Sequence, residues 1–315
     1  MTSTPRTYVV AGSSGFIGSA LVASLQADGH RVVRLVRRLP EHEDEVLWNP
    51  SLGATGASRD LRDALEGVHA VVNLAGAGIA EKRWDDAWKR AILDSRVAAT
   101  TCLATAIADT TVKPGVFVSA SASGYYGDTG PDAVEEDAPA GSTFLARVCQ
   151  AWEQSAAPAV EAGVRVVHPR TGLVMADGGG ALDRLLPMVK LGVGGRLGSG
   201  RQWWSPISLA DEVGALRHLC DSPELSGPVN LVAPQQATNA SLTAALGHAV
   251  HRPTVAVVPG FALRIALGEF ADELLLDQRM SPRRLVASGY EFAHPTIDAI
   301  VAEAVTPDIP VTPSE

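Results

Sequence analysis

The chain has 315 residues, a formal net charge of −9 and 46% hydrophobic residues. That length can bury the core of one large domain or of a domain and a half, and the acidic balance argues against a nucleic-acid or acidic-membrane partner. No apolar run approaches the roughly 20 residues that span a bilayer, and the N-terminus lacks the apolar core of a signal peptide.

The first elements expected along the chain are a strand, a glycine-rich turn, a helix and a second strand. Thr7–Ala11 has the pattern of a buried strand and leads directly into Gly12-Ser13-Ser14-Gly15-Phe16-Ile17-Gly18. Apolar residues at helical spacing follow as far as Gly29, and Arg31–Val36 is the second strand. This unit binds a dinucleotide pyrophosphate, because glycines let the backbone approach the phosphates and the helix N-terminus offers free N–H groups.

The end of the second strand indicates which dinucleotide binds. An NAD site usually carries an acid there for the ribose 2′-hydroxyl, but this strand ends in Arg37 and Arg38 with no acid before Glu41. Two guanidinium groups suit a 2′-phosphate, which a carboxylate would repel. We therefore predict NADP(H) rather than NAD(H); a solvated basic loop is the alternative.

The first half of the chain then continues to alternate strands with helices. We expect strands at 46–48, 69–76, 116–119 and 164–168, and helices at 61–65, 84–108 and 143–162. This alternation predicts an α/β fold with a Rossmann doubly wound parallel sheet, whose ligands bind at the C-terminal ends of the strands.

The pattern changes after Arg170. A helix is expected at 181–190, and the glycine-crowded segment 192–204 ends in two tryptophans; it either packs over something or is an ordinary connection. A helix begins with a capping pair at Ser208 and Asp211, and a late strand is expected at 229–232. We predict an NADP(H)-binding Rossmann domain at 1–172 with 201–233 returning to it, a smaller α/β substrate-binding module at 173–200 and 234–305, and a loose tail at 306–315.

Several short motifs recur together in one known superfamily. They are the glycine turn, Val72-Asn73-Leu74-Ala75-Gly76, Lys82-Arg83-Trp84, Ser95-Arg96, the run from Ser121 to Asp128, Trp152-Glu153, Arg170-Thr171-Gly172, Gly198 to Gln202, and Pro282-Arg283-Arg284-Leu285. In this order they resemble the extended short-chain dehydrogenase/reductase superfamily of nucleotide-sugar epimerases and dehydratases. More narrowly, they resemble its "epimerase family protein" branch, which has its own C-terminal module and sometimes carries a cell-division-inhibitor label.

The resemblance implies a set of NADP(H) contacts. Around the pyrophosphate it implies Gly12, Ser14, Gly15, Phe16 and Ile17; at the 2′-phosphate Arg37, with Arg38 second; beside the adenosine ribose Leu74, Ala75 and Gly76; from the long helix Arg96; and near the nicotinamide Ser119 and Leu173.

The catalytic part departs from the superfamily pattern. That pattern uses a serine to bind the substrate oxygen and a Tyr-x-x-x-Lys pair, in which lysine lowers the pKa of tyrosine. Ser121 matches the serine, with Ser123 second, but Phe144 and Val148 occupy the tyrosine and lysine positions. Arg147 stands one residue short of the lysine position and would point about 100° away on a helix.

The proton must then come from another group. Tyr125 and Tyr126 follow the serine loop directly, and Asp128 or Glu153 could tune one of them. Alternatively, both tyrosines only pack beneath the glycine-rich loop, and water supplies the proton. The histidines form no metal-ligand cluster, so no metal site is expected.

Two functional interpretations remain open. The first is an NADP(H)-binding oxidoreductase or epimerase-like enzyme acting on a small carbonyl, hydroxyl or sugar-like substrate. The second is a non-catalytic NADP(H)-binding sensor or scaffold, which the residues at 144 and 148 favour. The three cysteines share no short spacing, which favours reduced thiols in a cytoplasmic protein. The sequence leaves a homodimer open.

Overall fold

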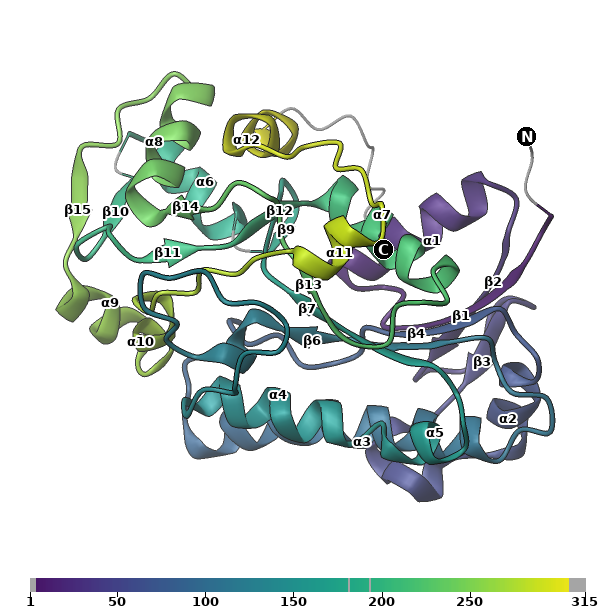
Figure 1. Ribbon diagram of the computed structural model, residues 1–315. Coiled ribbons are helices and arrows are strands. Elements are labelled where there is room, and N and C mark those ends of the chain that lie inside the picture. The colour runs from purple at the N-terminus through teal and green to yellow at the C-terminus, as the bar shows by residue number, and fades with distance from the viewer. Residues whose placement is uncertain (1–3, 181, 193, 306–315) are drawn as a thin grey trace.

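The structure, a computed structural model, describes residues 4–180, 182–192 and 194–305. Its centre is a parallel sheet with the strand order β13-β7-β5-β4-β1-β2-β3, in which β6 also pairs with β7 (Figure 1). The strands are β1 (Thr7–Ala11), β2 (Arg31–Val36), β3 (Glu45–Leu47), β4 (Ala70–Asn73), β5 (Phe117–Ser119), β6 (Ser121–Ala122), β7 (Val166–Thr171) and β13 (Gly227–Leu231).

Helices cover both faces of this sheet. α1 (Phe16–Ala27) and α7 (Leu209–Asp221) pack on one face, where Leu21, Leu25 and Leu216 are fully buried. The other face carries α2 (Arg59–Leu65), α3 (Asp86–Ala108), α4 (Phe144–Gln154), α5 (Ala157–Glu161) and the short 3-10 helix η1 (Pro50–Gly56). The predicted doubly wound parallel α/β fold is confirmed.

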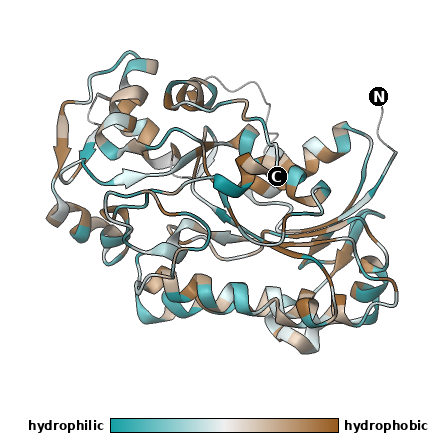
Figure 2. Cartoon of the chain, viewed as in Figure 1, coloured by the Kyte–Doolittle hydropathy of each residue, from teal (hydrophilic) through white to brown (hydrophobic). Residues whose placement is uncertain are grey.

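The strands owe their position to their composition. β1 and β4 consist almost entirely of apolar, largely β-branched residues and are buried on both faces, as is typical of parallel strands between two helical layers. Figure 2 shows these central strands in brown, in contrast to the teal outer surfaces of the helices.

One predicted helix is two helices in the structure. The helix expected over 143–162 ends at Gln154, and α5 begins at Ala157 after a break. Pro158 lies in the first turn of α5, a position that tolerates proline, whereas a proline inside a continuous helix would remove a hydrogen bond and clash with the preceding turn. By contrast, α3 continues without a break through Ala108.

α3 is 23 residues long, and by length and composition alone it could cross a membrane. In the structure it is a core helix. Ile92, Leu103 and Ile107 are fully buried, the latter two in the layer that also contains residues of the sheet and α5. This packing accounts for its apolar composition.

A smaller group of elements follows β7. They are β8 (Leu173–Ala176), β9 (Gly179–Gly180), α6 (Leu182–Lys190), β10 (Gly195–Leu197), β11 (Trp203–Trp204), β12 (Pro206–Ser208), β14 (Ala237–Thr238), α8 (Asn239–Ala249), β15 (Ala256–Val258), α9 (Gly260–Leu267), α10 (Phe270–Leu274), α11 (Arg283–Ala287) and α12 (Ile297–Val305). Many of them share a hydrophobic core that includes Met175, Leu186, Trp204 and Val301.

Two parts of the glycine-crowded segment, 195–197 and 203–204, pair with other strands. β10 pairs in parallel with β15, and β11 pairs with β14. A Cβ atom at Gly195 would lie only 2.0 Å from the carbonyl oxygen of Ala256, so the two strands approach at a distance that only glycine allows. Two interpretations were left open for this segment, and the structure supports the one in which the segment packs against other parts of the chain.

Candidate functional site

The turn between β1 and α1 is packed backbone against backbone. Gly12 has a φ of +78°, and its carbonyl oxygen accepts a hydrogen bond from the Gly15 N–H at 3.0 Å. A Cβ at Gly18 would lie 2.1 Å from the Gly12 oxygen, and one at Gly12 would lie 2.8 Å from the carbonyl carbon of Leu74. The glycines therefore hold the turn tightly against the loop that follows β4.

The N-terminus of α1 is suited to a phosphate group. Its N-cap is Gly15, which has no side chain to accept from the first N–H groups, and the first turn contains no acid. Ser14 and Gly15 are exposed, and Phe16 and Ile17 are half-buried. The free N–H groups and the positive end of the helix dipole thus face an open position between β1 and α1.

The two arginines that follow β2 differ in their contacts. Arg38 donates two hydrogen bonds of 2.8 Å to the carboxylate of Glu45, and these bonds, with one from the Glu41 N–H, lower the pKa of Glu45 to about 2. Arg37 is exposed and makes no hydrogen bond or ion pair with any other described residue. The expected pair of free guanidinium groups is therefore reduced to one, because Glu45 already holds Arg38.

The loop after β4 meets α3 through an arginine. Nη1 of Arg96 donates to the Ala77 carbonyl oxygen at 2.9 Å, and its guanidinium lies 5.0 Å from the centre of the Trp152 ring. A Cβ at Gly76 would come within 3.2 Å of the Arg96 side chain. Partial burial lowers the pKa of Arg96. The loop Leu74–Gly76 lies between Gly12 on one side and the Arg96 side chain on the other.

Ser119 ends β5 with an unused hydroxyl. The residue is fully buried, and its Oγ has no hydrogen-bond partner in the part of the chain that the structure describes. The ring of His168 contacts the carbonyl oxygen of Ser119 at 3.2 Å, and burial lowers the pKa of this histidine. A buried hydroxyl without a partner is uncommon and marks a position where a ligand could bind.

The hairpin of β8 and β9 contacts the glycine turn between β1 and α1, which we call the nucleotide turn. Leu173, half-buried, begins β8. A Cβ at Gly179 would lie 2.1 Å from the ring of Phe16, so the ring occupies the space that a side chain at 179 would need. The turn and the hairpin are therefore in direct contact.

Ser121 belongs to a buried polar cluster. Its Oγ donates to Oε1 of Glu153 at 2.7 Å, and Glu153 accepts two hydrogen bonds of 2.9 Å from Arg170. Ser121 and Arg170 are partners in the register of β6 and β7, and α4 brings Glu153 over both. With its proton directed at Glu153, Ser121 presents its lone pairs to any further partner.

The two tyrosines after Ser121 also contact Arg170. The guanidinium lies 3.3 Å from the centre of the Tyr125 ring, and Nη1 donates to the Tyr126 hydroxyl at 2.9 Å. Tyr126 in turn donates to Oδ1 of Asn230 at 2.7 Å, and burial raises its pKa to about 12.

Both tyrosines lie in one hydrophobic cluster with Val134, Ala138 and Met280. The hydroxyl of Tyr126 is thus committed to structural hydrogen bonds, which argues against it as the proton donor.

The position of the superfamily tyrosine is filled by an apolar cluster. The Phe144 ring lies 5.1 Å from the Trp84 ring in an edge-on arrangement, and Val148 is buried against the same group together with Ile92. Arg147 points to solvent and donates to the carbonyl oxygen of Ser142. No group on this face of α4 can transfer a proton.

Sequence reasoning missed two members of this region. Arg170, the centre of the polar cluster, was named only as part of the motif Arg170-Thr171-Gly172 and was given no role. Gln278 accepts a hydrogen bond of 2.8 Å from Ser123 although 155 positions separate them, and no local pattern could indicate that contact.

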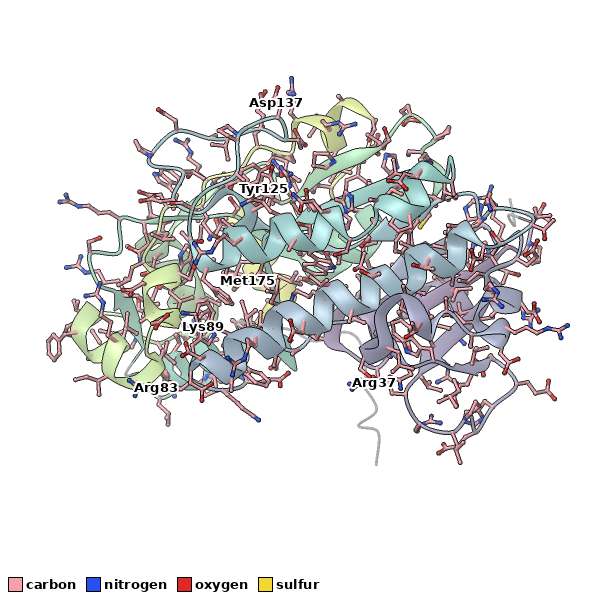
Figure 3. All side chains as sticks on the ribbon, turned by 90° about the horizontal axis from the view of Figure 1, so that it is seen from below. Arg37, Arg83, Lys89, Tyr125, Asp137 and Met175 are labelled. Carbon is pink, nitrogen blue, oxygen red and sulfur yellow. The ribbon has the colours of Figure 1, made fainter. Side chains whose placement is uncertain are left out.

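The cluster and the nucleotide turn occupy different parts of the sheet. Figure 3 shows Tyr125 and Arg37 on opposite sides of α3. Among the side chains that the structure describes, no group of histidine, cysteine and acidic residues could hold a metal ion.

A doubly wound sheet with an uncapped glycine turn after its first strand defines a dinucleotide-binding α/β protein of the Rossmann class. Residues 8–226 match the model of the NAD dependent epimerase/dehydratase family, and 258–304 match a domain of unknown function, DUF1731. The chain belongs to the NAD dependent epimerase/dehydratase family, and the expected resemblance is confirmed.

Individual relatives cover nearly the whole chain. Epimerase family protein Mb2239 of Mycobacterium bovis is 48% identical over 298 residues, which are 94% of this chain and 97% of that protein. The structure of human epimerase family protein SDR39U1 (isoform 2) with NADPH is 33% identical with a TM-score of 0.86, over 95% of this chain and 98% of the other. The structure of a nucleoside-diphosphate sugar epimerase from Corynebacterium glutamicum is 32% identical with a TM-score of 0.77, and the match covers 96% of this chain and 58% of that chain.

Proposed function

We propose that this chain binds NADP(H) and catalyses hydride transfer between the nicotinamide and a carbon of a small carbonyl, carbinol or sugar-like substrate. The observation that carries the proposal is the backbone cradle of Gly12, Gly15 and Gly18 beside the uncapped start of α1. This cradle fits a pyrophosphate, since no side chain caps the first N–H groups of α1 and no Cβ at these glycines obstructs the approach.

The preference for the phosphorylated cofactor rests on Arg37. Its guanidinium is exposed and free of other described residues, whereas the nearby acid, Glu45, is neutralised by Arg38. A 2′-phosphate would therefore meet a cation without competition from a carboxylate. The human relative with 33% identity was solved with NADPH, which agrees with this choice.

In the proposed mechanism Ser121 contacts the substrate oxygen. When bound, the cofactor supplies or accepts the hydride. Because Glu153 already accepts the Ser121 proton, Ser121 accepts a hydrogen bond from a substrate hydroxyl, which favours the carbinol as the bound form. Arg170 donates two hydrogen bonds to Glu153 and so holds that carboxylate where Ser121 keeps this orientation, while the proton released from the carbinol passes to water.

A second candidate is a non-catalytic NADP(H) sensor. It is favoured by the apolar cluster around Phe144 and Val148, because this cluster leaves no acid or base at the usual position on α4. It shares the cofactor site with the first candidate and differs only in the absence of turnover.

The test separates binding from turnover. NADPH and NADH are titrated into the protein by fluorescence, and NADP⁺ reduction is then followed with a panel of polyols and aldoses. We expect NADPH to bind, and Ser121→Ala to lower turnover about 100-fold with an unchanged Kd for NADPH. Ser123→Ala, whose hydroxyl bonds to Gln278, is the matched control. Binding without turnover selects the sensor, and no binding at about millimolar NADPH refutes both candidates.

A further inference from the structure

The side chain of Gln278 reaches the loop from Ser121 to Tyr126 out of the C-terminal part of the chain. Its Oε1 accepts a hydrogen bond of 2.8 Å from Ser123, which stands two residues after Ser121. Within the residues that the structure describes, its Nε2 makes no hydrogen bond, and this atom is open to solvent. One half of the amide is therefore satisfied, and the other half offers two donors to a ligand.

The backbone at Gln278 is held by its own hydrogen bonds. The Gln278 N–H donates to the Trp203 carbonyl oxygen at 2.8 Å, and the Gln278 carbonyl oxygen accepts from the Ser205 hydroxyl at 2.7 Å. Two residues further along, Met280 forms a β-bridge with Val134. Because none of these contacts involves the Gln278 side chain, a substitution there leaves the segment in place.

The charged residues on either side of Gln278 lie against Trp203. Oδ1 of Asp277 accepts from the Trp203 N–H at 2.7 Å, and the Arg279 guanidinium lies 4.1 Å from the centre of the Trp203 ring. The two charges are opposite, so together they attract neither an anion nor a cation to this position. Gln278 thus presents an uncharged donor, which suits an uncharged oxygen as its partner.

Ser121 and Ser123 point to the same side of their segment. Ala122 between them is extended, with a φ of −153° and a ψ of 162°, and side chains two residues apart on an extended segment share one side. At about 3.3 Å per residue, the two serines stand roughly 7 Å apart along the chain. A substrate whose reacting oxygen contacts Ser121 therefore reaches the Gln278 donors when it carries another oxygen several carbons away.

We propose that Gln278 is a specificity-determining residue, whose amide donates to a second, uncharged oxygen of the substrate while Ser121 contacts the reacting oxygen. This inference rests on the proposed function, hydride transfer beside Ser121. It narrows the substrate to a carbon chain with several oxygens, because a simple alcohol or aldehyde would leave the Gln278 donors without a partner. The contact is distant from the reacting carbon and is the same before and during the reaction, so its loss raises KM and leaves kcat unchanged.

The test removes the donors and keeps the shape of the side chain. Gln278→Glu retains an oxygen for the Ser123 hydroxyl but has no N–H group, and Gln278→Ala removes the amide without adding a charge. For the best polyol or aldose of the substrate panel, we expect both variants to lower kcat/KM at least about tenfold, mainly through KM, with kcat/KM for 1-propanol and the Kd for NADPH unchanged. Gln26→Glu makes the same chemical change at an exposed position of α1 and should alter none of these values.

Two kinetic outcomes overturn the proposal: variants that keep the parent's preference for the polyol over 1-propanol, and variants that lose both activities equally, which indicates a structural role. If the parent turns over no substrate, hydride transfer fails as the proposed function, and binding then decides the role of Gln278. Ligand-observed NMR with sorbitol and glucose should show binding to the NADPH-bound parent that Gln278→Glu weakens; no binding, or equal binding by both proteins, overturns the inference. Circular dichroism shows whether each variant is folded.

Discussion

Two regions of the central sheet, which we call its backbone end (β1 and α1) and its side-chain end (β5, β6 and β7), differ in what forms them. At β1 and α1 the candidate site is made of backbone: glycines, free N–H groups and tight turns that leave no room for a Cβ. At β5, β6 and β7 it is made of side chains: buried charges around Arg170 and an apolar cluster at Phe144. The comparison teaches that the first region depends on where glycine stands along the chain, whereas the second depends on which side chains the fold brings together.

The largest effect should follow from breaking the charge pairing at the side-chain end. Glu153→Ala leaves Arg170 buried without its carboxylate, so we expect a loss of about 3–5 kcal/mol in the free energy of unfolding. Urea denaturation measures it. Glu135→Ala removes an exposed partner of Arg283 and should cost no more than about 1 kcal/mol. Equal losses for both variants would contradict the role given to the buried cluster.

The pH dependence of stability tests the same region of the sheet through Glu212. This fully buried carboxyl accepts a hydrogen bond from Thr171, and burial raises its pKa to about 8. The folded protein therefore holds this proton more tightly than the unfolded chain. Its contribution to stability is complete below the ordinary carboxyl pKa of 4.5 and is lost as pH rises through about 8.

Glu212→Gln cannot ionise, so its stability relative to the parent should improve by a few kcal/mol, as an order of magnitude, between about pH 5 and pH 8. Urea unfolding at both pH values measures this difference. Glu43→Gln, at an exposed position, should show none. A parent and a Glu212→Gln variant that keep a constant difference across this range would rule out the raised pKa.

The backbone end is tested by adding a single methyl group. Gly18→Ala places a Cβ against the Gly12 oxygen, so we expect a loss of about 1–3 kcal/mol in stability and at least tenfold weaker NADPH binding. Fluorescence titration and thermal unfolding give the two values. Ser19→Ala, on the exposed side of the same helix turn, is the control, and a Gly18→Ala protein that binds NADPH normally would remove the cradle from the proposal.

Cofactor choice should depend on one side chain. Arg37→Ala is expected to weaken NADPH about tenfold, or about 1.4 kcal/mol, and to leave NADH unchanged, because only NADPH carries the 2′-phosphate. Arg31→Ala removes an exposed arginine at the other end of the same strand and should alter neither. If Arg37→Ala weakened the binding of NADPH and NADH equally, Arg37 would not be the residue that contacts the 2′-phosphate.

The smallest effect is expected for Phe144→Tyr. The ring is half-buried beside Trp84, so the added hydroxyl should change stability by less than about 1 kcal/mol and should not raise turnover, since Val148 still provides no charge. Steady-state rates with the same panel of substrates show whether turnover rises, and thermal unfolding gives the change in stability. A tenfold gain would mean that the position still faces the substrate.

Sequence reasoning succeeded where structure is local. The unit from Thr7 to Val36 was predictable because strand composition, glycine spacing and helical periodicity all lie within one short segment. The break before α5 was visible in Pro158 but was outweighed by the helical pattern around it.

The side-chain end of the site could not be predicted in the same way. The contact of Ser121 with Glu153 depends on α4 crossing β6, and that of Ser123 with Gln278 depends on a return of the chain from its C-terminal part. The engagement of Arg38 by Glu45 likewise needs β3 to lie beside β2. No periodicity records such pairings, so the candidates had to be chosen by residue type alone.

The contact between Phe16 and Gly179 links the turn after β1 to the hairpin of β8 and β9. One bare α-carbon in a remote hairpin leaves the space in which an aromatic ring of the phosphate-facing turn can rest. A methyl group added at position 179 would clash with that ring, and Phe16 and the first turn of α1 would have to move. We therefore expect a substitution in the hairpin to change the affinity for the coenzyme, although the hairpin lies far along the chain from the turn after β1.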